Sequence, residues 1–458
     1  MTNQPKKDKK PIYKTTVKAY DGLCEMVYDE KKNRTYFVTL DSSGVIGERD
    51  QIAVDEEIFK PLPPNHMLVQ KRVVLFPSKL EDYKDEQEII NEVQSFIHKY
   101  LDISEVYEGI ATYYVLFSWL YDKFNEVPYL RTIGDYGTGK SRFLQTIGSL
   151  CYKPIFTGGA TTPSPIFRIV DETGGTLIID EADFKYSDMT SDLVKILNTG
   201  YQKGIPVLRT EGKGTYEVKA YNVFSPKIVA TRETFSDKAL ESRFLVEEMS
   251  VGTIRAGIPR TLEEDFYNDS QKIRNKLLRW RLDNYLKKID KNDEQLIEGI
   301  HPRLNQIVLP LFSIIKDPQT KQTLKDFIVK YNVDLVADRG LSWESDIIFA
   351  ILKIQHDEIK NEMSVKEITN MANFETDEND HITARKTGWY LRSKLQLKTE
   401  KKRNGFILSI PRNKDKLLFW KERFGITDSE IKGELVNDVN IAEVPSTPIT
   451  ENLGFSTR

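Results

Sequence analysis

Gly134-Asp-Tyr-Gly-Thr-Gly-Lys-Ser141 is the stretch that decides the fold of this chain of 458 residues. It fits the pattern G-x-x-x-x-G-K-S/T and lies between a run at 128–133 that predicts a strand and a run at 143–150 that predicts a helix. The backbone amides of such a loop point inward at a helix N-terminus, where phosphate groups are favoured. The stretch therefore predicts a phosphate-binding loop, or P-loop, in an α/β fold.

The loop also predicts how a nucleotide would be held. All eight residues are candidates for contact with the nucleotide: Gly134, Asp135, Tyr136, Gly137, Thr138, Gly139, Lys140 and Ser141. Lys140 is expected to reach the β- and γ-phosphates of ATP, and the Ser141 hydroxyl to hold Mg²⁺. The alternative is a glycine-rich turn that matches the pattern by chance, and the next motif makes that alternative less attractive.

A second motif, Gly175-Thr-Leu-Ile-Ile-Asp180-Glu181, is an apolar run that ends in two carboxylates. A continuous Leu/Ile run is typical of a buried parallel strand, and ligand chemistry gathers at the carboxyl ends of such strands. We therefore expect Asp180 next to the P-loop, where it orients the metal. Glu181 is expected to take a proton from the attacking water. The alternative is a strand that ends in two solvated acids.

The composition is that of a globular protein without a strong overall charge. Hydrophobic residues make up 39% and charged residues 29% of the chain, and the formal net charge is −3, so a nucleic-acid surface has to be a local basic patch. Cys24 and Cys151 lie far apart without nearby Cys or His, which excludes a zinc site of the usual spacing and favours a reducing compartment. The longest apolar run, 109–121, is too short for a membrane span, and no signal peptide is evident. We expect a cytoplasmic protein with no membrane partner.

Two further segments follow the second motif. Residues 206–218 alternate like a β-hairpin with Gly212-Lys213-Gly214 at its tip. An exposed Lys213 there either contacts a phosphate backbone or is solvated, and the residues alone do not favour one over the other. Residues 227–231 form another apolar strand, which ends in the hydroxyl of Thr231.

Thr231 and Ala239-Leu-Glu-Ser-Arg-Phe244, in this order after the two earlier motifs, resemble the AAA+ ATPases. The resemblance is to the helicase-related branch, which includes minichromosome-maintenance helicases and replication ATPases of phages, plasmids and integrative elements, and it covers about Pro128 to Leu311. It implies that Thr231 senses the γ-phosphate, although asparagine is commoner there. It also implies a ring-shaped homo-oligomer, typically a hexamer, that binds DNA.

The same resemblance assigns three basic residues. Arg243 is expected to be an arginine finger that reaches the nucleotide of the neighbouring subunit, an effect worth about 10³ to 10⁵ in rate. Its alternative is a surface arginine at a helix end. Lys213 lies where these helicases place a lysine that grips DNA, which favours the DNA interpretation. Arg303 lies where a lid-domain sensor arginine can contact the nucleotide.

The C-terminal part resembles a winged-helix domain, with three expected helices followed by a hairpin that turns at Asn404-Gly405. From Thr383 to Lys416 there are eleven Lys or Arg and two Asp or Glu, a formal balance of +9. Such a concentration suits DNA phosphates, although winged helices also bind protein and a basic face can simply be solvated. The candidate DNA-binding residues there are Arg385, Lys386, Arg392, Lys394, Lys401, Lys402 and Arg403.

These patterns predict six segments: a disordered tail at 1–12, a small β-rich domain at 13–80, an AAA+ core with leading helices at 85–255, a helical lid at 256–335, a winged helix at 340–425 and a disordered tail at 427–458. The expected activity is that of an ATP-hydrolysing, helicase-like DNA motor in the replication of a genome or mobile element. Two alternatives remain open, namely an ATP-switched replication initiator or regulator that does not unwind DNA, and a protein-remodelling ATPase.

Overall fold

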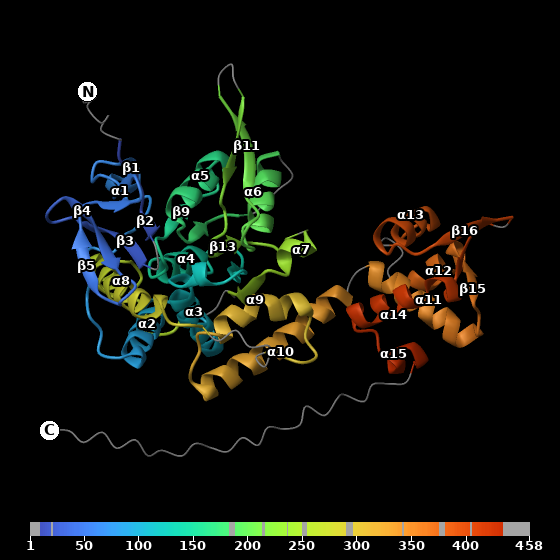
Figure 1. Ribbon diagram of the computed structural model, residues 1–458. Coiled ribbons are helices and arrows are strands. Elements are labelled where there is room, and N and C mark those ends of the chain that lie inside the picture. The colour runs from blue at the N-terminus through green and yellow to red at the C-terminus, as the bar shows by residue number, and fades with distance from the viewer. Residues whose placement is uncertain are drawn as a thin grey trace, which may run out of the picture. The chain divides into compact units, whose positions relative to one another are not determined.

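The computed structural model describes residues 10–19, 22–182, 188–212, 216–235, 237–249, 254–289, 296–340, 343–374, 381–403 and 405–433. The chain divides into two compact units, residues 1–329 and 330–458, and each is described by itself (Figure 1). Lys213, Gly214 and Asn404, which the sequence analysis singled out, lie outside the described residues. Among the described helices, none is long and apolar enough to cross a membrane.

A five-stranded parallel sheet forms the centre of the first unit, as the sequence predicts for a mixed α/β fold. Its strand order is β14-β8-β13-β10-β9. The bounds are β8 (Tyr129–Ile133), β9 (Ile155–Thr157), β10 (Leu177–Ile179), β13 (Lys227–Thr231) and β14 (Phe244–Glu248). Because β8, β13 and β10 are neighbours and run in the same direction, the residues that follow them meet at one edge of the sheet.

Helices cover this sheet, and local sequence signals explain where they begin. The Asp85 side chain accepts a hydrogen bond from the Glu88 amide and so starts α2, and Pro163 occupies the first turn of α5. The helices of the unit are α1 (Met67–Gln70), α2 (Glu86–Tyr100), α3 (Glu105–Ser118), α4 (Lys140–Gly148), α5 (Pro163–Thr173), α6 (Asp188–Thr199), α7 (Lys238–Glu241), α8 (Glu264–Tyr285) and α9 (Pro302–Phe312). A further helix, α10 (Pro318–Gly340), spans the boundary between the two units.

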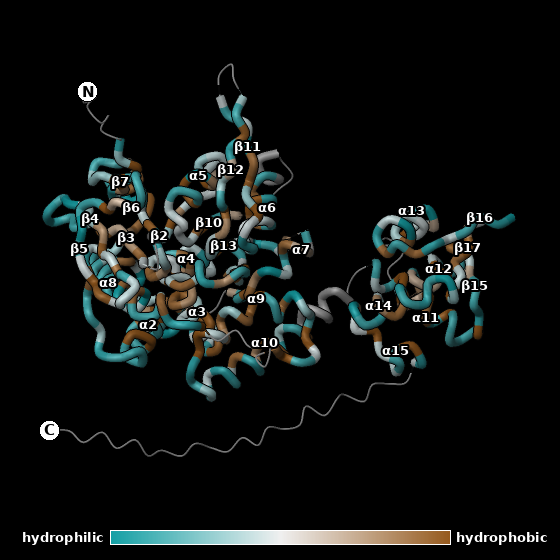
Figure 2. The backbone as a smooth tube through the Cα atoms, in the orientation of Figure 1, coloured by the Kyte–Doolittle hydropathy of each residue, from teal (hydrophilic) through white to brown (hydrophobic). Residues whose placement is uncertain are grey.

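Helix α3 is apolar over most of its length, and its hydrophobic residues are brown in Figure 2. Its aromatic side chains and those just after it are buried in the core: Tyr113, Tyr114, Phe117, Trp119 and Tyr121. The helix ends at Ser118, and the chain then forms a single turn of 3₁₀ helix at Tyr121–Lys123.

The N-terminal part contains two small sheets. The first is an antiparallel meander of β2 (Thr16–Ala19), β3 (Gly22–Asp29), β4 (Arg34–Leu40) and β5 (Ile46–Arg49). The second has the order β1-β7-β6, from β1 (Ile12–Tyr13), β6 (Ile52–Val54) and β7 (Glu57–Lys60). Both sheets belong to the first unit and do not form a separate one.

A buried group of charges attaches the first small sheet to the helices. Glu25 on β3 lies 2.9 Å from both the Lys153 ammonium and the Arg281 guanidinium of α8, and all three side chains are 1% exposed. Arg281 also pairs with Asp122 at 3.0 Å. Burial opposes ionisation of Glu25, but the two cations outweigh it and lower the pKa of its carboxyl. The N-terminal strands are therefore fixed to α8 by groups that are costly to separate.

A two-stranded hairpin of β11 (Val207–Glu211) and β12 (Glu217–Tyr221) projects beyond α5 and α6 (Figure 1). Its register pairs Val207 with Tyr221, so alternate residues share a face. One face carries charged side chains that pair with α5 and α6, as in the contact of Glu211 with Arg168. The other face carries no charge and is exposed at Leu208 and Val218.

The second unit is α11 (Trp343–Glu358), β15 (Glu362–Ser364), α12 (Val365–Ala372), α13 (Ala384–Trp389), β16 (Thr399–Lys402), β17 (Gly405–Ser409), α14 (Ile410–Phe424) and α15 (Asp428–Lys432). Its antiparallel sheet has the order β15-β17-β16. Ile347, Ile351, Leu391, Leu395 and Leu408 lie in its core. The unit therefore has a sheet and a hydrophobic core of its own.

Three details of this unit differ from the predictions. The third expected helix is two elements, α13 followed by a π-helical turn at Tyr390–Lys394. Lys402 pairs with Gly405, so Gly405 belongs to β17 and not to the predicted turn. The described chain also continues past 427, because Thr427 and Glu430 form a capping box that starts α15.

Candidate nucleotide site

The P-loop runs from the end of β8 to the start of α4, as predicted. Two of its glycines are required by the geometry. A Cβ at Gly134 would lie 2.5 Å from the Met249 carbonyl oxygen, which no side chain allows. Gly139 precedes α4 with φ of 96°, a left-handed conformation that glycine adopts without the penalty of a Cβ. The loop therefore passes close to the chain after β14 and turns sharply into the helix.

The Lys140 side chain folds back over the loop. Its ammonium donates to the carbonyl oxygens of Gly134 and Asp135, at 2.6 and 2.7 Å. Asp135 also accepts the Tyr136 amide through its carboxylate at 2.7 Å, and the Thr138 hydroxyl donates to the Asp135 carbonyl at 2.9 Å. The loop is thus held by its own polar groups, with the positive charge inside its curve.

Ser141 and Asp180 bring the two sequence motifs into contact. The Ser141 hydroxyl donates to Asp180 Oδ2 at 2.8 Å, across the edge of the sheet. A hydroxyl beside a carboxylate supplies hard oxygen ligands, and Mg²⁺ commonly binds through one or two such protein groups together with substrate phosphates. The residues therefore fit a magnesium ion shared with a nucleotide. Among the described residues, no group of three or more His, Cys, Asp or Glu side chains could hold a metal by itself.

Glu181 adopts a strained backbone next to this pair. Its φ is 53°, in the left-handed region that a residue with a Cβ rarely occupies, and its amide donates to Asp180 Oδ1 at 2.9 Å. The side chain is exposed and lies beside Gly159. Strain of this kind costs about 1 kcal/mol or more and persists where the surrounding structure enforces it. Here the left-handed backbone of Glu181 directs its exposed carboxylate away from the strand direction, at the edge of the sheet where the P-loop lies.

Thr231 lies at the same edge, at the end of β13, where its carbonyl accepts the Gly134 amide at 3.3 Å. Its hydroxyl is buried and makes no hydrogen bond to any residue that the structure describes. The next residue, Arg232, holds its guanidinium 3.8 Å from the centre of the Tyr136 ring. Sequence reasoning did not single out Arg232, which adds a second cation to the outer side of the P-loop.

A cavity of about 960 Å³ opens beside the P-loop. Its walls come from four separate segments: 100–104, the P-loop and α4 at Thr138, Gly139 and Arg142, the end of β14 at 247–249, and 254–260. Glu247 lines it with a half-buried carboxyl that accepts the Ser104 amide at 2.8 Å, and burial raises the pKa of Glu247. Such a volume can hold the base and ribose of a nucleotide whose phosphates lie on the loop.

Hydrogen bonds from α4 and to the segment at 98–102 hold the 254–260 segment over this cavity. Arg142 on α4 donates to the carbonyl oxygens of Pro259 and Arg260 at 3.0 and 2.7 Å. The Arg255 amide donates to Asp102 at 2.7 Å. The cavity was not predicted from sequence, because its walls share no local motif and meet only through the fold.

Arg243 lies at the amino ends of the parallel strands, whereas the P-loop lies at their carboxyl ends, on the opposite edge of the sheet. Its carbonyl accepts the amide of Tyr129, the first residue of β8, at 3.0 Å, whereas Gly134 follows the last residue of that strand. Five residue steps along a parallel strand, at about 3.3 Å each, separate the two places by about 16 Å. Arg243 therefore does not reach the P-loop of its own chain.

The Arg243 side chain is buried, with 6% exposed. Its Nη1 donates to Asn198 Oδ1 at 2.7 Å and to the Ala239 carbonyl, and the guanidinium lies 4.3 Å from the centre of the Tyr201 ring. Burial, and secondly the charge of Arg303, lower the pKa of Arg243. Arg243 is therefore enclosed by its own chain in this structure and is not the surface arginine of the alternative prediction.

Arg303, on the first turn of α9, joins the same edge. Its guanidinium donates to the Ser242 hydroxyl at 3.1 Å and to the Ala239 carbonyl at 3.4 Å. The structure brings Arg303 together with Arg243, whereas Lys140, Ser141, Asp180, Glu181 and Thr231 meet at the P-loop edge. The predicted site residues therefore form two groups at opposite edges of one sheet.

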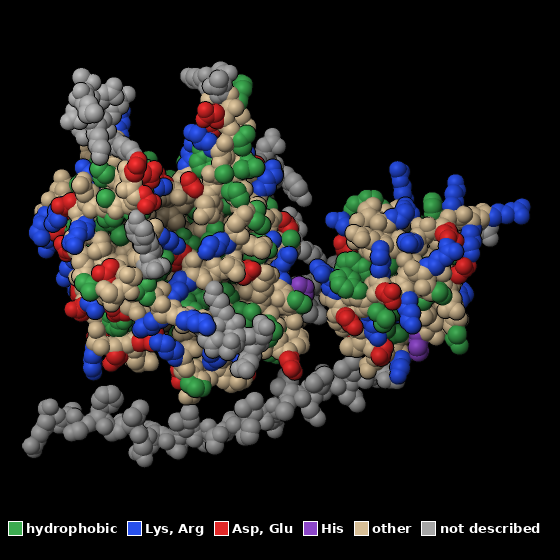
Figure 3. Space-filling view, viewed as in Figure 1, with side chains coloured by type: hydrophobic (Ala, Val, Ile, Leu, Met, Phe, Trp, Pro, Cys, Tyr) green, Lys and Arg blue, Asp and Glu red, His purple; other side chains and the backbone are tan. Residues whose placement is uncertain are grey.

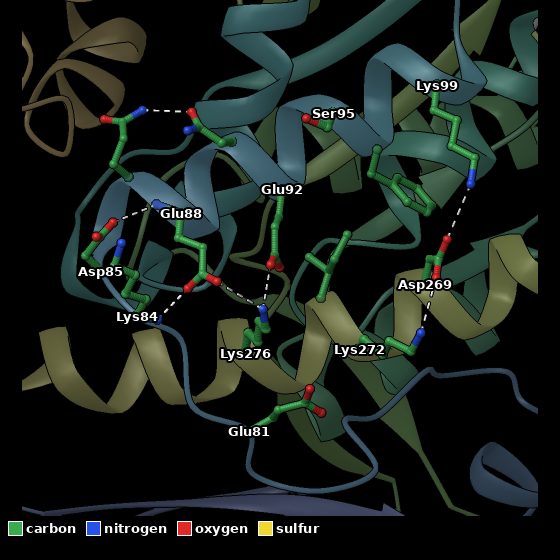
Figure 4. Close-up of a pocket in the computed structure, with 14 residues that line it drawn as sticks. Glu81, Lys84, Asp85, Glu88, Glu92, Ser95, Lys99, Asp269, Lys272 and Lys276 are labelled. Carbon is green, nitrogen blue, oxygen red and sulfur yellow. Dashed lines mark hydrogen bonds and ion pairs between the residues drawn. The ribbon is translucent and has the colours of Figure 1, made fainter. Parts of the chain in front are cut away.

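A second cavity, of about 810 Å³, lies between α2 and α8 and is shown in Figure 4. Its charged side chains pair with one another across the groove. Lys276 contacts Glu92 at 2.5 Å, and Asp269 lies 3.5 Å from both Lys99 and Lys272. Because these charged side chains already pair with one another, few of them are left to bind a charged ligand in this groove.

The candidate DNA-binding residues of the second unit are all exposed: Arg385, Lys386, Arg392, Lys394, Lys401, Lys402 and Arg403. Figure 3 shows Lys and Arg side chains around α13 and along the β16–β17 hairpin. The Arg392 guanidinium lies 4.9 Å from the centre of the Phe406 ring, and Lys402 pairs with Glu362 at 2.6 Å. The Arg392 contact connects the π-helical turn after α13 to β17, and the Lys402 pair connects β16 to β15.

No model of a known protein family matches the chain, and a search of curated proteins finds no relative. Among solved structures, the chain is similar to the NrS-1 C-terminal region, with 12% identity over 84% of this chain and 95% of that one and a TM-score of 0.37. It is similar to the active helicase Cch of SCCmec type IV, with 11% identity, 88% and 98% coverage and a TM-score of 0.36. For a full-length MCM homolog from Methanopyrus kandleri the values are 11%, 69%, 75% and 0.33. These TM-scores are too low to carry a conclusion about fold or function.

Proposed function

We propose that the protein is an AAA+ ATPase that hydrolyses ATP between neighbouring subunits of a ring and uses it to move DNA, as a helicase-like motor. The observation that carries the proposal is the 2.8 Å hydrogen bond between Ser141 of the P-loop and Asp180 at the end of β10. Two motifs that are separate in sequence thereby share one edge of the sheet. This is the arrangement needed to hold a metal ion against nucleotide phosphates.

In this proposal each residue at the P-loop edge has one task. Lys140 exchanges the loop carbonyls of Gly134 and Asp135 for the β- and γ-phosphates. Ser141 and Asp180 hold Mg²⁺, which neutralises charge on the phosphates when it is bound. Glu181 accepts a proton from the attacking water, and Thr231 senses the γ-phosphate. The cavity lined by Glu247 and the 254–260 segment takes the base.

Arg243 supplies the remaining group, from the neighbouring subunit. The separation of about 16 Å from its own P-loop, set by five strand residues, supports action in trans, because the side chain does not reach its own nucleotide. Arg303 lies beside it and would approach the same neighbour. A positive charge at the transferring phosphoryl group stabilises its transition state.

DNA is the proposed partner of the second unit and of the β11–β12 hairpin. The second unit has a helix–strand–helix–helix–hairpin order, with exposed cations on α13 and the hairpin, which supports a winged helix on a phosphate backbone. We further propose that Lys213, at the hairpin tip, grips the strand. A DNA-bound regulator that does not unwind shares these features, and it differs only in showing no strand separation on forked DNA.

The test is the ATPase rate of the wild type, Lys140→Ala and the control Lys71→Ala, each with no DNA, single-stranded DNA, duplex DNA or an unfolded polypeptide. Lys71 is an exposed lysine of the same unit, away from the P-loop motif. We expect Lys140→Ala to lose ATP turnover and Lys71→Ala to keep it. We expect DNA to stimulate ATP turnover in the wild type. Stimulation by the polypeptide but not by DNA would favour the protein-remodelling alternative. Wild-type turnover in Lys140→Ala would refute the proposed site.

A further inference from the structure

The end of α6 holds the side chain of Arg243 inside its own chain. Asn198 accepts from the guanidinium at 2.7 Å, and the Tyr201 ring lies against it at 4.3 Å. An arginine that is 6% exposed does not contact the ligand of another subunit. If Arg243 acts on a neighbour, its side chain therefore has to leave these two partners first.

The orientation of the Asn198 amide is fixed by a third residue. Asn198 Nδ2 donates to Asp237 Oδ2 at 2.7 Å, and Asp237 Oδ1 accepts the amides of Ala239 and Leu240 at the start of α7. A carboxylate only accepts hydrogen bonds, so the nitrogen of Asn198 has to face Asp237. The amide oxygen is thereby left to face Arg243, which makes the contact specific rather than incidental.

This position is an unfavourable one for a charge. None of the hydrogen-bond acceptors of the Arg243 guanidinium among the described residues is a carboxylate, and its Nε has no partner there. The nearby Arg303 carries a charge of the same sign. The nearby Asp237 carboxylate bonds to Asn198 and not to Arg243, so it compensates the charge of Arg243 only from behind Asn198. A buried cation whose direct hydrogen-bond acceptors are neutral keeps part of its desolvation penalty, so moving to an anionic phosphate is favoured.

We propose that Asn198 and Tyr201 hold Arg243 in a resting position, and that hydrolysis in the neighbouring subunit requires Arg243 to leave it. This inference rests on the proposed function, and it makes Asn198 and Tyr201 positioning residues. Helix α6 lies between Glu181 and the β11–β12 hairpin in the chain. A shift of α6 on binding of nucleotide or DNA would therefore alter the hold on Arg243.

The experiment compares substitutions that weaken and strengthen the hold, in the full chain at saturating ATP and protein. Asn198→Ala and Tyr201→Leu each remove one contact, and we expect turnover without DNA to rise, by roughly tenfold for a lost hydrogen bond to a charged group. Asn198→Asp combined with Asp237→Asn exchanges the carboxylate and the amide, so Arg243 faces a carboxylate while the hydrogen bond between positions 198 and 237 is kept, and we expect turnover without DNA to fall. Stimulation by DNA should shrink in the first two variants. Thr199→Ala is the control, because the Thr199 hydroxyl bonds only to carbonyls of its own helix.

Changes of opposite sign in Asn198→Ala and in the double variant Asn198→Asp with Asp237→Asn would not come from a merely structural role. If both lose turnover in parallel with a lower melting temperature, or both match the wild type, the resting position is refuted. Lys140→Ala and Arg243→Ala, measured in the same assay, distinguish a failure of the resting position from a failure of the proposed function. If both abolish turnover while the Asn198 variants match the wild type, the ATPase assignment stands and only the resting position fails. Unchanged turnover in Lys140→Ala would overturn both.

Discussion

Replacing Glu25 with glutamine tests how firmly the N-terminal sheet is attached to the ATPase unit. The substitution keeps the shape of the side chain but removes the negative charge that Lys153 and Arg281 share at 2.9 Å. Arg281 keeps Asp122, so Lys153 loses its ion-pair partner in a site that is 1% exposed. Breaking a buried pair in this way costs about 3 to 5 kcal/mol of unfolding free energy.

Urea unfolding followed by tryptophan fluorescence measures this cost, because Trp119 and Trp280 are buried in the first unit. Asp50→Asn is the matched control. Asp50 pairs with Arg34 at 2.8 Å, but the two side chains are 74% and 45% exposed, so solvent screens the pair. We expect the control to unfold like the wild type. Equal unfolding midpoints for Glu25→Gln and Asp50→Asn would refute the reasoning.

The same pair predicts a pH dependence. The pKa of Glu25 is lowered in the folded protein, so the ionised carboxylate stabilises the fold fully above its unfolded pKa of about 4.3. The stabilisation is lost as the pH falls through the folded pKa. The difference in stability between the wild type and Glu25→Gln should therefore be constant from about pH 5 to pH 7 and shrink in stronger acid. Above pH 7 a second group enters, because burial lowers the pKa of the partner Lys153 to about 8.

Three further predictions concern the candidate sites. Glu181→Gln keeps the shape of the side chain but removes its basicity, so we expect ATP to bind and persist with turnover reduced about 10² to 10⁴-fold, measured by nucleotide retention beside phosphate release; parental turnover would contradict its role as base. Arg243→Ala should keep nucleotide affinity and lose turnover. Mixing Arg243→Ala with Glu181→Gln subunits should restore some activity, because some interfaces then pair an intact finger with an intact base. No recovery in rings shown to be mixed would argue against action in trans. Deleting residues 341–458 should weaken duplex DNA binding and reduce its log–log salt slope by about 0.9 for each lost phosphate contact while basal hydrolysis remains; an unchanged slope would favour the protein-adaptor alternative.

The strands and motifs that could be predicted are those encoded within one continuous stretch of sequence. The P-loop strand, the run that ends in Asp180 and the strand that ends in Thr231 are each continuous segments, and their parallel pairing brings their ends together. The aromatic residues of α3 lie in the core because an apolar helix without a polar face has to be buried. In these cases the pattern within one segment contains the information that the fold uses.

Features that depend on distant segments were not predictable in this way. The cavity beside the P-loop joins four segments, and Glu25 reads as an ordinary polar residue in a strand until Lys153 and Arg281 are brought to it. Asn198 carries no motif at all. The register of β16 with β17 also escaped prediction, because Asn404-Gly405 favours a turn one residue later than the pairing of Lys402 with Gly405.

The placement of Lys140 and Arg243 at opposite edges of one sheet has a consequence for assembly. If Lys140 of one subunit and Arg243 of the next must meet across an interface, that interface joins two different surfaces of the protein. Subunits then associate head to tail and not about a two-fold axis. An open string of such subunits has one complete site fewer than it has members, whereas a closed ring has as many sites as members. A lone subunit has none. Closing the ring would thus supply the last site, and the rate per subunit would report how completely the assembly has closed.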